Sequence, residues 1–286
     1  MADPRKKLST NAAGDFFVDS TCINCDTCRQ LAPRTFGEAQ GYSFVEVQPE
    51  DGPTRRAATQ ALLSCPTGSI GDSGRNQAKE IMQDFPMLLD ESVYYCGFNS
   101  PKSYGGNSYF IQKADGNWLI DSPKFLPHLV QSFHAMGGLS YIFLTHQDDV
   151  AEAAAYAKEF GARRIIHRDD VSAEPASEIV VDGHGDTKFG DDIVIITTPG
   201  HTAGHCVLLY KNKYLFTGDH LAWDRDMAGL VAWPEVCWYD WEQQKDSLRK
   251  LTSYEFSWIL PGHGQRISLT NDAMKSELNT LLERLK

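Results

Sequence analysis

Apolar residues recur along the chain with two different spacings, which predict strands in alternation with helices. Strands are predicted where apolar side chains alternate with polar ones or form runs of four to six residues, and helices where they repeat every three or four. The predicted strands are residues 16–18, 42–47, 107–111, 118–121, 141–145, 164–167, 193–198, 206–210, 214–217 and 258–260, with a closing strand near residue 70. The predicted helices are residues 53–63, 124–136, 149–160, 241–251 and 271–285, with a helical stretch up to about residue 89.

A polar, glycine-containing segment at residues 71–76 divides this pattern into two parts. The part before it is short, and the part after it alternates strands and helices as an α/β domain does. A chain of 286 residues is long enough for one small and one large domain. We therefore expect domains at residues 1–80 and 81–286.

The charge of the chain is negative and concentrated in its larger part. The net charge is −11, and residues 1–80 contain 10 acidic and 9 basic side chains. A binder of nucleic acid needs a basic face, so the sequence predicts no nucleic-acid partner. No apolar run approaches the roughly 18 residues of a membrane span, so no membrane partner is expected either. The basic first residues are not followed by an apolar stretch, so a secretory signal is not expected. The predicted location is the cytoplasm, or the stroma of a plastid if a transit segment has been removed.

Four of the seven cysteines have the spacing of an iron-sulfur site. Cys22, Cys25 and Cys28 form a C-x2-C-x2-C run, and Cys65 follows far downstream with Pro66 directly after it. A loop of this kind holds three corners of a [4Fe-4S] cubane, and a distant Cys-Pro supplies the fourth. The alternative is a four-cysteine zinc site, although structural zinc usually takes paired C-x2-C ligands. The remaining cysteines are expected to be buried thiols in a reducing compartment, and they are Cys96, Cys206 and Cys237.

This segment, from about residue 15 to 73, resembles the bacterial-type ferredoxins that carry one [4Fe-4S] cluster. The resemblance implies a small ferredoxin-like α+β domain, with an electron-relay role for the cluster. Arg29 and Arg34 follow the cysteine loop, where positive charge would favour the reduced cluster. The alternative is that both are solvated helix residues.

Polar residues that can bind metal occur at the ends of four predicted strands. They are His146 with Asp148, His201, Asp219 and His263, and each strand end has a glycine or a tight turn beside it. Imidazole and carboxylate groups at neighbouring strand ends predict a metal site.

These motifs resemble the metallo-β-lactamase superfamily over about residues 94–286. That superfamily includes glyoxalase II, flavodiiron proteins and persulfide dioxygenases, and its αβ/βα four-layer sandwich is the expected fold. The resemblance assigns His146, His201, Asp219 and His263 as metal ligands. It also assigns Asp121 as a structural aspartate.

The first ligand loop departs from the family pattern. Asp148 stands where the family has a second histidine, and Val150 and Ala151 stand where it has an aspartate and a last histidine. A complete two-metal centre is therefore not expected unless Asp149 turns inward. His146, His201 and Asp219 make two imidazoles and one carboxylate, the ligand set of mononuclear non-haem iron enzymes. The resemblance to persulfide dioxygenases and flavodiiron proteins also favours one iron ion, with zinc as the alternative.

Three functions remain open at this point. The first is an oxidoreductase, in which the cluster exchanges electrons with the iron site, Asp148, Asp219 and His263 act in catalysis, and the partner is a redox protein or a small-molecule substrate. The second is a zinc-dependent hydrolase of esters or thioesters. The third is a degenerate metallo-β-lactamase scaffold that serves electron transfer or docking.

Other residues have weaker assignments. His205 is expected to support the site from a buried position rather than to bind metal, and His220 either lines the pocket or is an ordinary strand-end histidine. The aromatic-rich residues 223–241 either cover the site or pack in the core.

Overall fold

The computed structural model describes residues 2–74 and 77–286 of the chain. The chain divides into two compact units, residues 1–139 and 140–286. The domain boundary expected near residue 80 falls inside the first unit and stays a prediction. Residues 75 and 76, the end of the predicted linker, lie outside the described residues.

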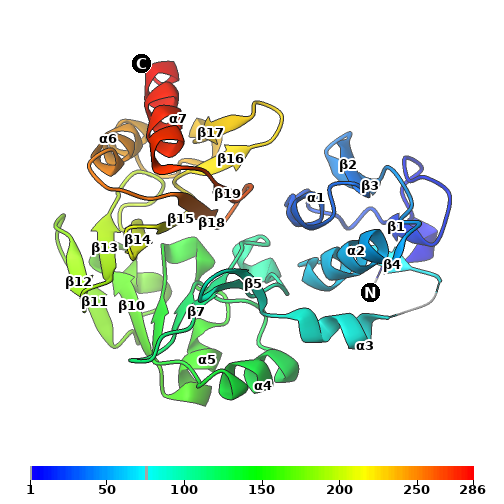
Figure 1. The fold of residues 1–286 in the computed structure, drawn as a ribbon, viewed down its shortest axis with the longest axis horizontal. Coiled ribbons are helices and arrows are strands. Elements are labelled where there is room, and N and C mark those ends of the chain that lie inside the picture. The colour runs from blue at the N-terminus through cyan, green and yellow to red at the C-terminus, as the bar shows by residue number, and fades with distance from the viewer. Residues whose placement is uncertain (1, 75–76) are drawn as a thin grey trace. The chain divides into compact units, whose positions relative to one another are not determined.

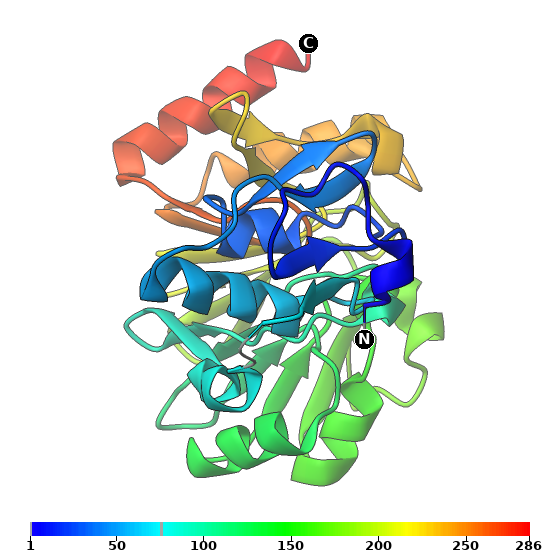
Figure 2. The ribbon, with the colours of Figure 1, turned by 90° about the vertical axis from the view of Figure 1, so that its right-hand side faces the viewer.

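Residues 2–72 form a small α+β module, as the sequence predicts. Its antiparallel strands pair as β1 with β4 and as β2 with β3. In Figure 2 the strand β1, the helix α2 and the β2–β3 hairpin face the viewer. The elements are η1 (Pro4–Lys6), β1 (Phe16–Val18), α1 (Thr27–Leu31), β2 (Phe36–Ala39), β3 (Tyr42–Val45), α2 (Gly52–Ser64) and β4 (Ile70–Asp72).

A compact apolar core holds this module together. Phe16 and Val45 from the strands and Ala58 and Ala61 from α2 are fully buried in one cluster. The two alanines lie three residues apart, so they share the inner face of the helix. The predicted linker was wrong at its start, because Gly71 and Asp72 extend β4 and pair with β1.

The rest of the first unit is an antiparallel meander of four strands. The strand β5 pairs with β6, β6 with β7, and β7 with β8. The helical stretch predicted up to residue 89 ends earlier, because residues 87–90 pair as a strand with β6. The elements are α3 (Ala78–Ile81), η2 (Met82–Asp84), β5 (Met87–Asp90), β6 (Val93–Tyr95), η3 (Pro101–Ser103), β7 (Tyr109–Ile111), β8 (Trp118–Ile120) and α4 (Pro127–Ala135).

The second unit begins with three parallel strands and their connections. The strand β10 lies between β9 and β11 and is parallel to both. Parallel neighbours need a crossover, and α5 supplies the one between β9 and β10. The elements are β9 (Tyr141–Phe143), η4 (Gln147–Asp149), α5 (Ala153–Phe160), β10 (Arg163–His167), η5 (Arg168–Ala173) and β11 (Ile179–Val181).

A six-stranded sheet with two helices completes the second unit. Its order is β12-β13-β14-β15-β18-β19, and its neighbours are antiparallel except for the parallel pair β15–β18. The last elements are β12 (Thr187–Phe189), β13 (Ile193–Thr197), β14 (Cys206–Tyr210), β15 (Tyr214–Gly218), β16 (Ala222–Asp224), β17 (Gly229–Val231), η6 (Pro234–Val236), α6 (Trp241–Leu251), β18 (Trp258–Pro261), β19 (Ile267–Ser268) and α7 (Asn271–Arg284).

The helices α6 and α7 cover one face of this sheet (Figure 1). Val207 and Leu215 of the sheet, Leu248 of α6, and Leu278 and Leu281 of α7 belong to one buried apolar cluster. This apolar packing holds the sheet in place, and the sheet in turn positions the loops at the ends of its strands. Among the described residues, no helix has the length and apolar character needed to cross a membrane.

Candidate metal centres

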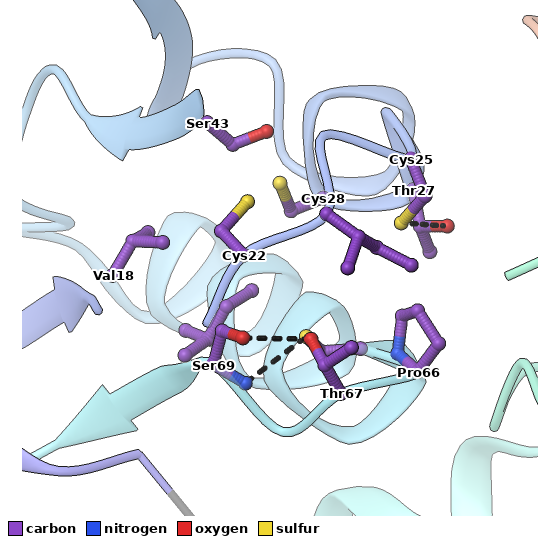
Figure 3. Close-up of a pocket in the computed structure, with 12 residues that line it drawn as sticks. Val18, Cys22, Cys25, Thr27, Cys28, Ser43, Pro66, Thr67 and Ser69 are labelled. Carbon is purple, nitrogen blue, oxygen red and sulfur yellow. Dashed lines mark hydrogen bonds between the residues drawn. The ribbon is translucent and has the colours of Figure 1, made fainter. Parts of the chain in front are cut away.

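The four cysteines of the predicted cluster site line one pocket of the first unit. Cys22, Cys25 and Cys28 come from the loop between β1 and α1, and Cys65 is the C-cap of α2. Figure 3 shows the thiols of the cysteine loop around one space, with Thr67 on its other side. All four cysteines are free thiols rather than disulfides. The spacing read from the sequence therefore corresponds to one site in space.

Hydrogen-bond donors surround these sulfur atoms. The backbone N–H groups of Asn24 and Ser69 point to the Sγ atoms of Cys22 and Cys65, at 3.4 and 3.3 Å. The hydroxyl of Thr27 lies 3.5 Å from Sγ of Cys25. Donors to sulfur stabilise the negative charge of a thiolate-bound cluster. The surroundings therefore fit an iron-sulfur cluster.

Burial gives a second argument for a bound group. Desolvation raises the pKa of the Cys25 thiol and of the fully buried Cys28 thiol. A buried thiolate is costly without a compensating positive charge, and a metal ion or cluster provides such a charge. Desolvation therefore disfavours the deprotonated form of both thiols, and metal coordination would offset that cost.

Of the two arginines singled out in the sequence, only Arg29 is buried. It belongs to α1, and its guanidinium forms ion pairs with Asp26 at 2.7 Å and Glu38 at 3.4 Å. Its charge is thus matched by two carboxylates. Arg34 is exposed to solvent.

The second candidate site lies in the second unit, at the ends of its strands. His146 and Asp148 follow β9, His201 follows β13, Asp219 follows β15 and His263 follows β18. Two sets of residues each have their possible ligand atoms within 4.8 Å of one another. One set is His146, Asp148 and His201, and the other is His146, Asp149 and Asp219. The structure thus brings the predicted residues of three separate loops together.

The distances between these side chains suit a shared ion. Nε2 of His201 lies 3.6 Å from Asp148 and 3.7 Å from Asp219, and Nε2 of His146 lies 3.7 Å from Asp219. These distances are longer than the donor–acceptor distance of a hydrogen bond. Among the described residues, neither buried Nε2 atom has a hydrogen-bond partner. Unpaired buried imidazole nitrogens that face carboxylates fit the coordination of a metal ion.

The side chain of Asp149 lies at this site. From the sequence, an inward-facing Asp149 is considered only as the requirement for a second metal ion. The turn η4 places Asp148 and Asp149 on different sides, so the side chain of Asp148 is 45% exposed and Asp149 is buried. A methyl group added to Gly262 would lie 2.9 Å from Oδ2 of Asp149 and 2.7 Å from Oδ1 of Asp219. The site therefore contains a third carboxylate, beside Asp219.

His263 contacts Asp219 directly. Its Nδ1 lies 2.9 and 3.0 Å from the two carboxylate oxygens of Asp219. Burial alone would raise the pKa of Asp219, but the imidazoles of His263, His146 and His201 outweigh burial and lower it. Burial lowers the pKa of His146 to about 4. At neutral pH the site therefore presents an ionised carboxylate and a neutral imidazole, the forms that bind metal.

Asp170, a residue not singled out in the sequence, fixes the loops that carry the histidines. Its carboxylate accepts hydrogen bonds from the backbone N–H of Gln147 at 3.0 Å, the hydroxyl of Thr202 at 2.5 Å and the N–H of Gly204 at 3.0 Å. Gln147 and Thr202 adjoin His146 and His201. Its signal in the sequence was its place after the strand at 164–167.

Two further histidines, His205 and His220, pack beside the site. Nδ1 of His205 is 3.0 Å from the hydroxyl of Thr198, and its Nε2 accepts the N–H of Asp219 at 3.3 Å. Both nitrogens are therefore engaged, so His205 supports the loop of Asp219. His220 is fully buried and stacks on His205 with ring centroids 5.2 Å apart.

Two exposed aromatic residues lie next to His201. The backbone N–H groups of Trp238 and Tyr239 both donate to the carbonyl of His201, at 3.0 and 3.1 Å. Their side chains are 65% and 56% exposed, and the Trp238 ring lies 6.3 Å from that of His201. Part of the 223–241 segment thus borders the site, while Leu230 packs in the core.

Comparison with known proteins covers both parts of the chain. Residues 18–72 match the family model of the 4Fe-4S single cluster domain of Ferredoxin I. The structure of the DIM-1 metallo-beta-lactamase aligns with 70% of this chain and 96% of its own, with a TM-score of 0.53 and 16% sequence identity. The chain joins a [4Fe-4S] ferredoxin domain to a metallo-β-lactamase fold. The fold predicted from the sequence is thereby confirmed.

Two curated relatives each match about half of the chain. A hydroxyacylglutathione hydrolase of Acidiphilium cryptum is 30% identical over 139 residues, which are 48% of this chain and 51% of the relative. An atrochrysone carboxyl ACP thioesterase of Aspergillus fumigatus is 25% identical over 164 residues, which are 57% of this chain and 41% of the relative. The chain thus spans about half or less of the length of these relatives.

Proposed function

We propose that the chain is a metal-dependent oxidoreductase. In this proposal the [4Fe-4S] cluster exchanges electrons with one iron ion bound by His146, His201 and Asp219, with Asp148 and His263 beside them. The observation that carries the proposal is the donor set of the second site, which has three imidazoles and three carboxylates in a chain that also has a ferredoxin domain.

The balance of imidazole and carboxylate ligands favours iron over a zinc site of the hydrolytic kind. In the two-metal family pattern this loop holds four imidazole or carboxylate ligands. Two of them are lost here, at Val150 and Ala151, and carboxylates stand at Asp148 and Asp149. Two imidazoles with one carboxylate leave coordination positions open in non-haem iron proteins. Iron bound here would supply one-electron chemistry at such positions.

The protein residues have separate tasks in this proposal. The hydroxyl of Thr145 lies 2.9 Å from Nδ1 of His146, which leaves Nε2 of His146 for the metal. Asp219 holds His263 in place through the bond to Nδ1. Asp148 is half-exposed, and the neighbouring His201 lowers its pKa, so that Asp148 stays ionised and is suited to act as a negatively charged ligand at the edge of the site.

Metal analysis of protein purified without oxygen tests the proposal. We expect iron beyond the four cluster atoms, and a second electron paramagnetic resonance signal or Mössbauer component in addition to that of the cluster. The variant Asp219→Asn should lose this additional iron, with affinity lowered by more than about 100-fold, since even partners of metal ligands are worth 10–100-fold. Asp169→Asn, at an exposed aspartate outside the site, is the matched control. Stoichiometric zinc without redox activity would refute the proposal.

A second candidate function is hydrolysis of a thioester. It is favoured by the names of the two relatives, a hydroxyacylglutathione hydrolase and an acyl-carrier-protein thioesterase. The chemistry supplied by zinc in that case would be activation of water for attack on a carbonyl carbon. A panel of thioesters separates the candidates, because zinc-loaded protein should hydrolyse one of them and the Asp219→Asn variant should not.

A further inference from the structure

Side chains from outside the matched ferredoxin segment contact the loops that carry the cluster ligands. The ammonium of Lys124 donates to the carbonyl of Cys65 at 3.1 Å, across 59 positions of sequence. The hydroxyl of Tyr104 donates to the carbonyl of Ile23 at 2.9 Å, across 81 positions. The ferredoxin match ends at residue 72, so these contacts are additions to that domain within the first unit.

A buried asparagine makes a further contact that reaches a ligand sulfur. Nδ2 of Asn99 donates to the hydroxyl of Thr27 at 3.1 Å, and that hydroxyl lies 3.5 Å from Sγ of Cys25. Because the amide donates to the hydroxyl oxygen, the hydroxyl hydrogen is left for the sulfur. The hydroxyl of Tyr95 donates to Oδ1 of Asn99 at 2.8 Å, which fixes the orientation of the amide.

The backbone of the same segment lies against the cluster ligand Cys25. Gly105 has a φ of 89°, and a methyl group added there would lie 3.0 Å from Cβ of Cys25 and 2.9 Å from Cγ of Pro66. Only glycine allows this approach without strain. The segment therefore packs directly against Cys25 and Pro66, two residues that line the cysteine pocket.

We propose that Lys124 raises the reduction potential of the [4Fe-4S] cluster. Reduction adds one negative charge to the cluster, and a cation beside a ligand stabilises the reduced form more than the oxidised one. Lys124 is half-buried and bound to the backbone of Cys65, where solvent screens its charge only in part. Lys124 is thus a positioning residue for electron transfer, contributed by the segment after the ferredoxin domain.

A redox titration of the full chain with its cluster, followed by electron paramagnetic resonance, tests this inference. We expect Lys124→Gln to lower the equilibrium constant for reduction about tenfold, which is about 59 mV for a one-electron couple. Lys124→Arg keeps the charge and should keep the potential of the wild-type protein. Lys79→Gln removes an exposed lysine of α3 and is the control for net charge. The potential is measured on the cluster alone, so the result is independent of the reaction at the second metal site.

Two results would overturn the inference. One is a wild-type potential in Lys124→Gln, and the other is an equal shift in Lys124→Gln and Lys79→Gln. If Lys124→Gln fails to retain its cluster, Lys124→Met preserves the packing of the side-chain stem and replaces it in the titration. Loss of the cluster in both neutral variants, with retention in Lys124→Arg, would assign Lys124 a structural role and would also overturn the inference.

Discussion

Gly262 occupies a position where the metal site has no room for a side chain. A methyl group there would lie 2.7 Å from Oδ1 of Asp219 and 2.9 Å from Oδ2 of Asp149, well inside ordinary contact distance. We therefore expect Gly262→Ala to displace one or both carboxylates and to lower the metal content of the second site at least about tenfold, by analogy with the loss of a ligand partner. Metal analysis and the far-ultraviolet circular dichroism of the variant measure the two effects separately.

The control for this substitution is Gly185→Ala, because a methyl group on Gly185 meets no atom within 4 Å. It should keep both its metal and its fold. Full metal content in Gly262→Ala would show that Asp149 and Asp219 move aside without cost, and would remove Asp149 from the site.

At the residue scale the sequence predicts some of the candidate ligands better than others. His146, His201, Asp219 and His263 stand in short motifs after strands, and the structure places all four at neighbouring strand ends. The sequence does not predict with equal clarity that Asp149 lies at the site. Whether Asp148 or Asp149 faces inward depends on the turn η4, and a tight turn is set by backbone angles and by packing that no local pattern reports.

At the scale of elements, a cluster of charged groups holds the connection between β10 and β11. Arg164, near the start of β10, donates to Glu174 at 2.6 Å, to the carbonyl of Ala176 at 2.5 Å and to Glu178 at 2.6 Å. The hydrogen bonds from Arg164 lower the pKa of Glu178 from 4.5 to about 2. A pKa lowered in the folded state means that this carboxylate stabilises the fold above about pH 4.5, and that the contribution is lost as the pH falls toward about 2.

We therefore expect Glu178→Gln to lower the free energy of unfolding at pH 7 by about 1 kcal/mol, since the side chain is 40% exposed and solvent screens the pair. The difference from the wild-type protein should shrink below about pH 4.5. Urea unfolding followed by tryptophan fluorescence measures it, because five of the six tryptophans follow residue 140. Both proteins are compared without metal, so that acid release of iron does not contribute.

Glu255→Gln is the control, because Glu255 is an exposed carboxylate that lies outside this charged cluster. A difference between Glu178→Gln and the wild-type protein that stays constant from pH 7 to pH 3 would contradict the electrostatic explanation. Packing of the side chain, rather than its charge, would then hold the connection.

The sequence predicts well the helices that have a long repeating apolar pattern. It predicts poorly the strands whose conformation depends on pairing with a neighbouring strand. The helices α2, α6 and α7 lie within a few residues of the predicted ranges, since each has a repeating apolar face. The strand β5 was missed because residues 87–90 continue an apolar stretch that also suits a helix, and only pairing with β6 makes them a strand. The contacts of Asn99 and Lys124 with the cysteine loops span more than fifty positions, beyond any local pattern.

At the scale of the whole molecule, two candidate metal centres of different kinds share one chain. The four cysteines belong to the first unit, and the histidines and aspartates of the second candidate site belong to the second unit. Because no ligand is shared, loss of one centre should leave the binding residues of the other intact. Separate removal of the two centres therefore distinguishes the proposed oxidoreductase from a hydrolase.

The variant Cys65→Ser makes this test from the side of the cluster. It removes the thiol that Cys65 contributes to the cysteine pocket from outside the cysteine loop, so we expect loss of the [4Fe-4S] cluster, seen as loss of its visible absorbance, with the metal of the second site retained. If the cluster supplies electrons, redox turnover should fall to the background rate, whereas hydrolysis of a thioester needs no electrons and should continue unchanged. Cys96→Ala removes a thiol of the same unit outside the ligand set and should keep both centres. Undiminished redox turnover in Cys65→Ser would show that electrons reach the second site without the cluster, and would contradict the proposed role of the ferredoxin domain.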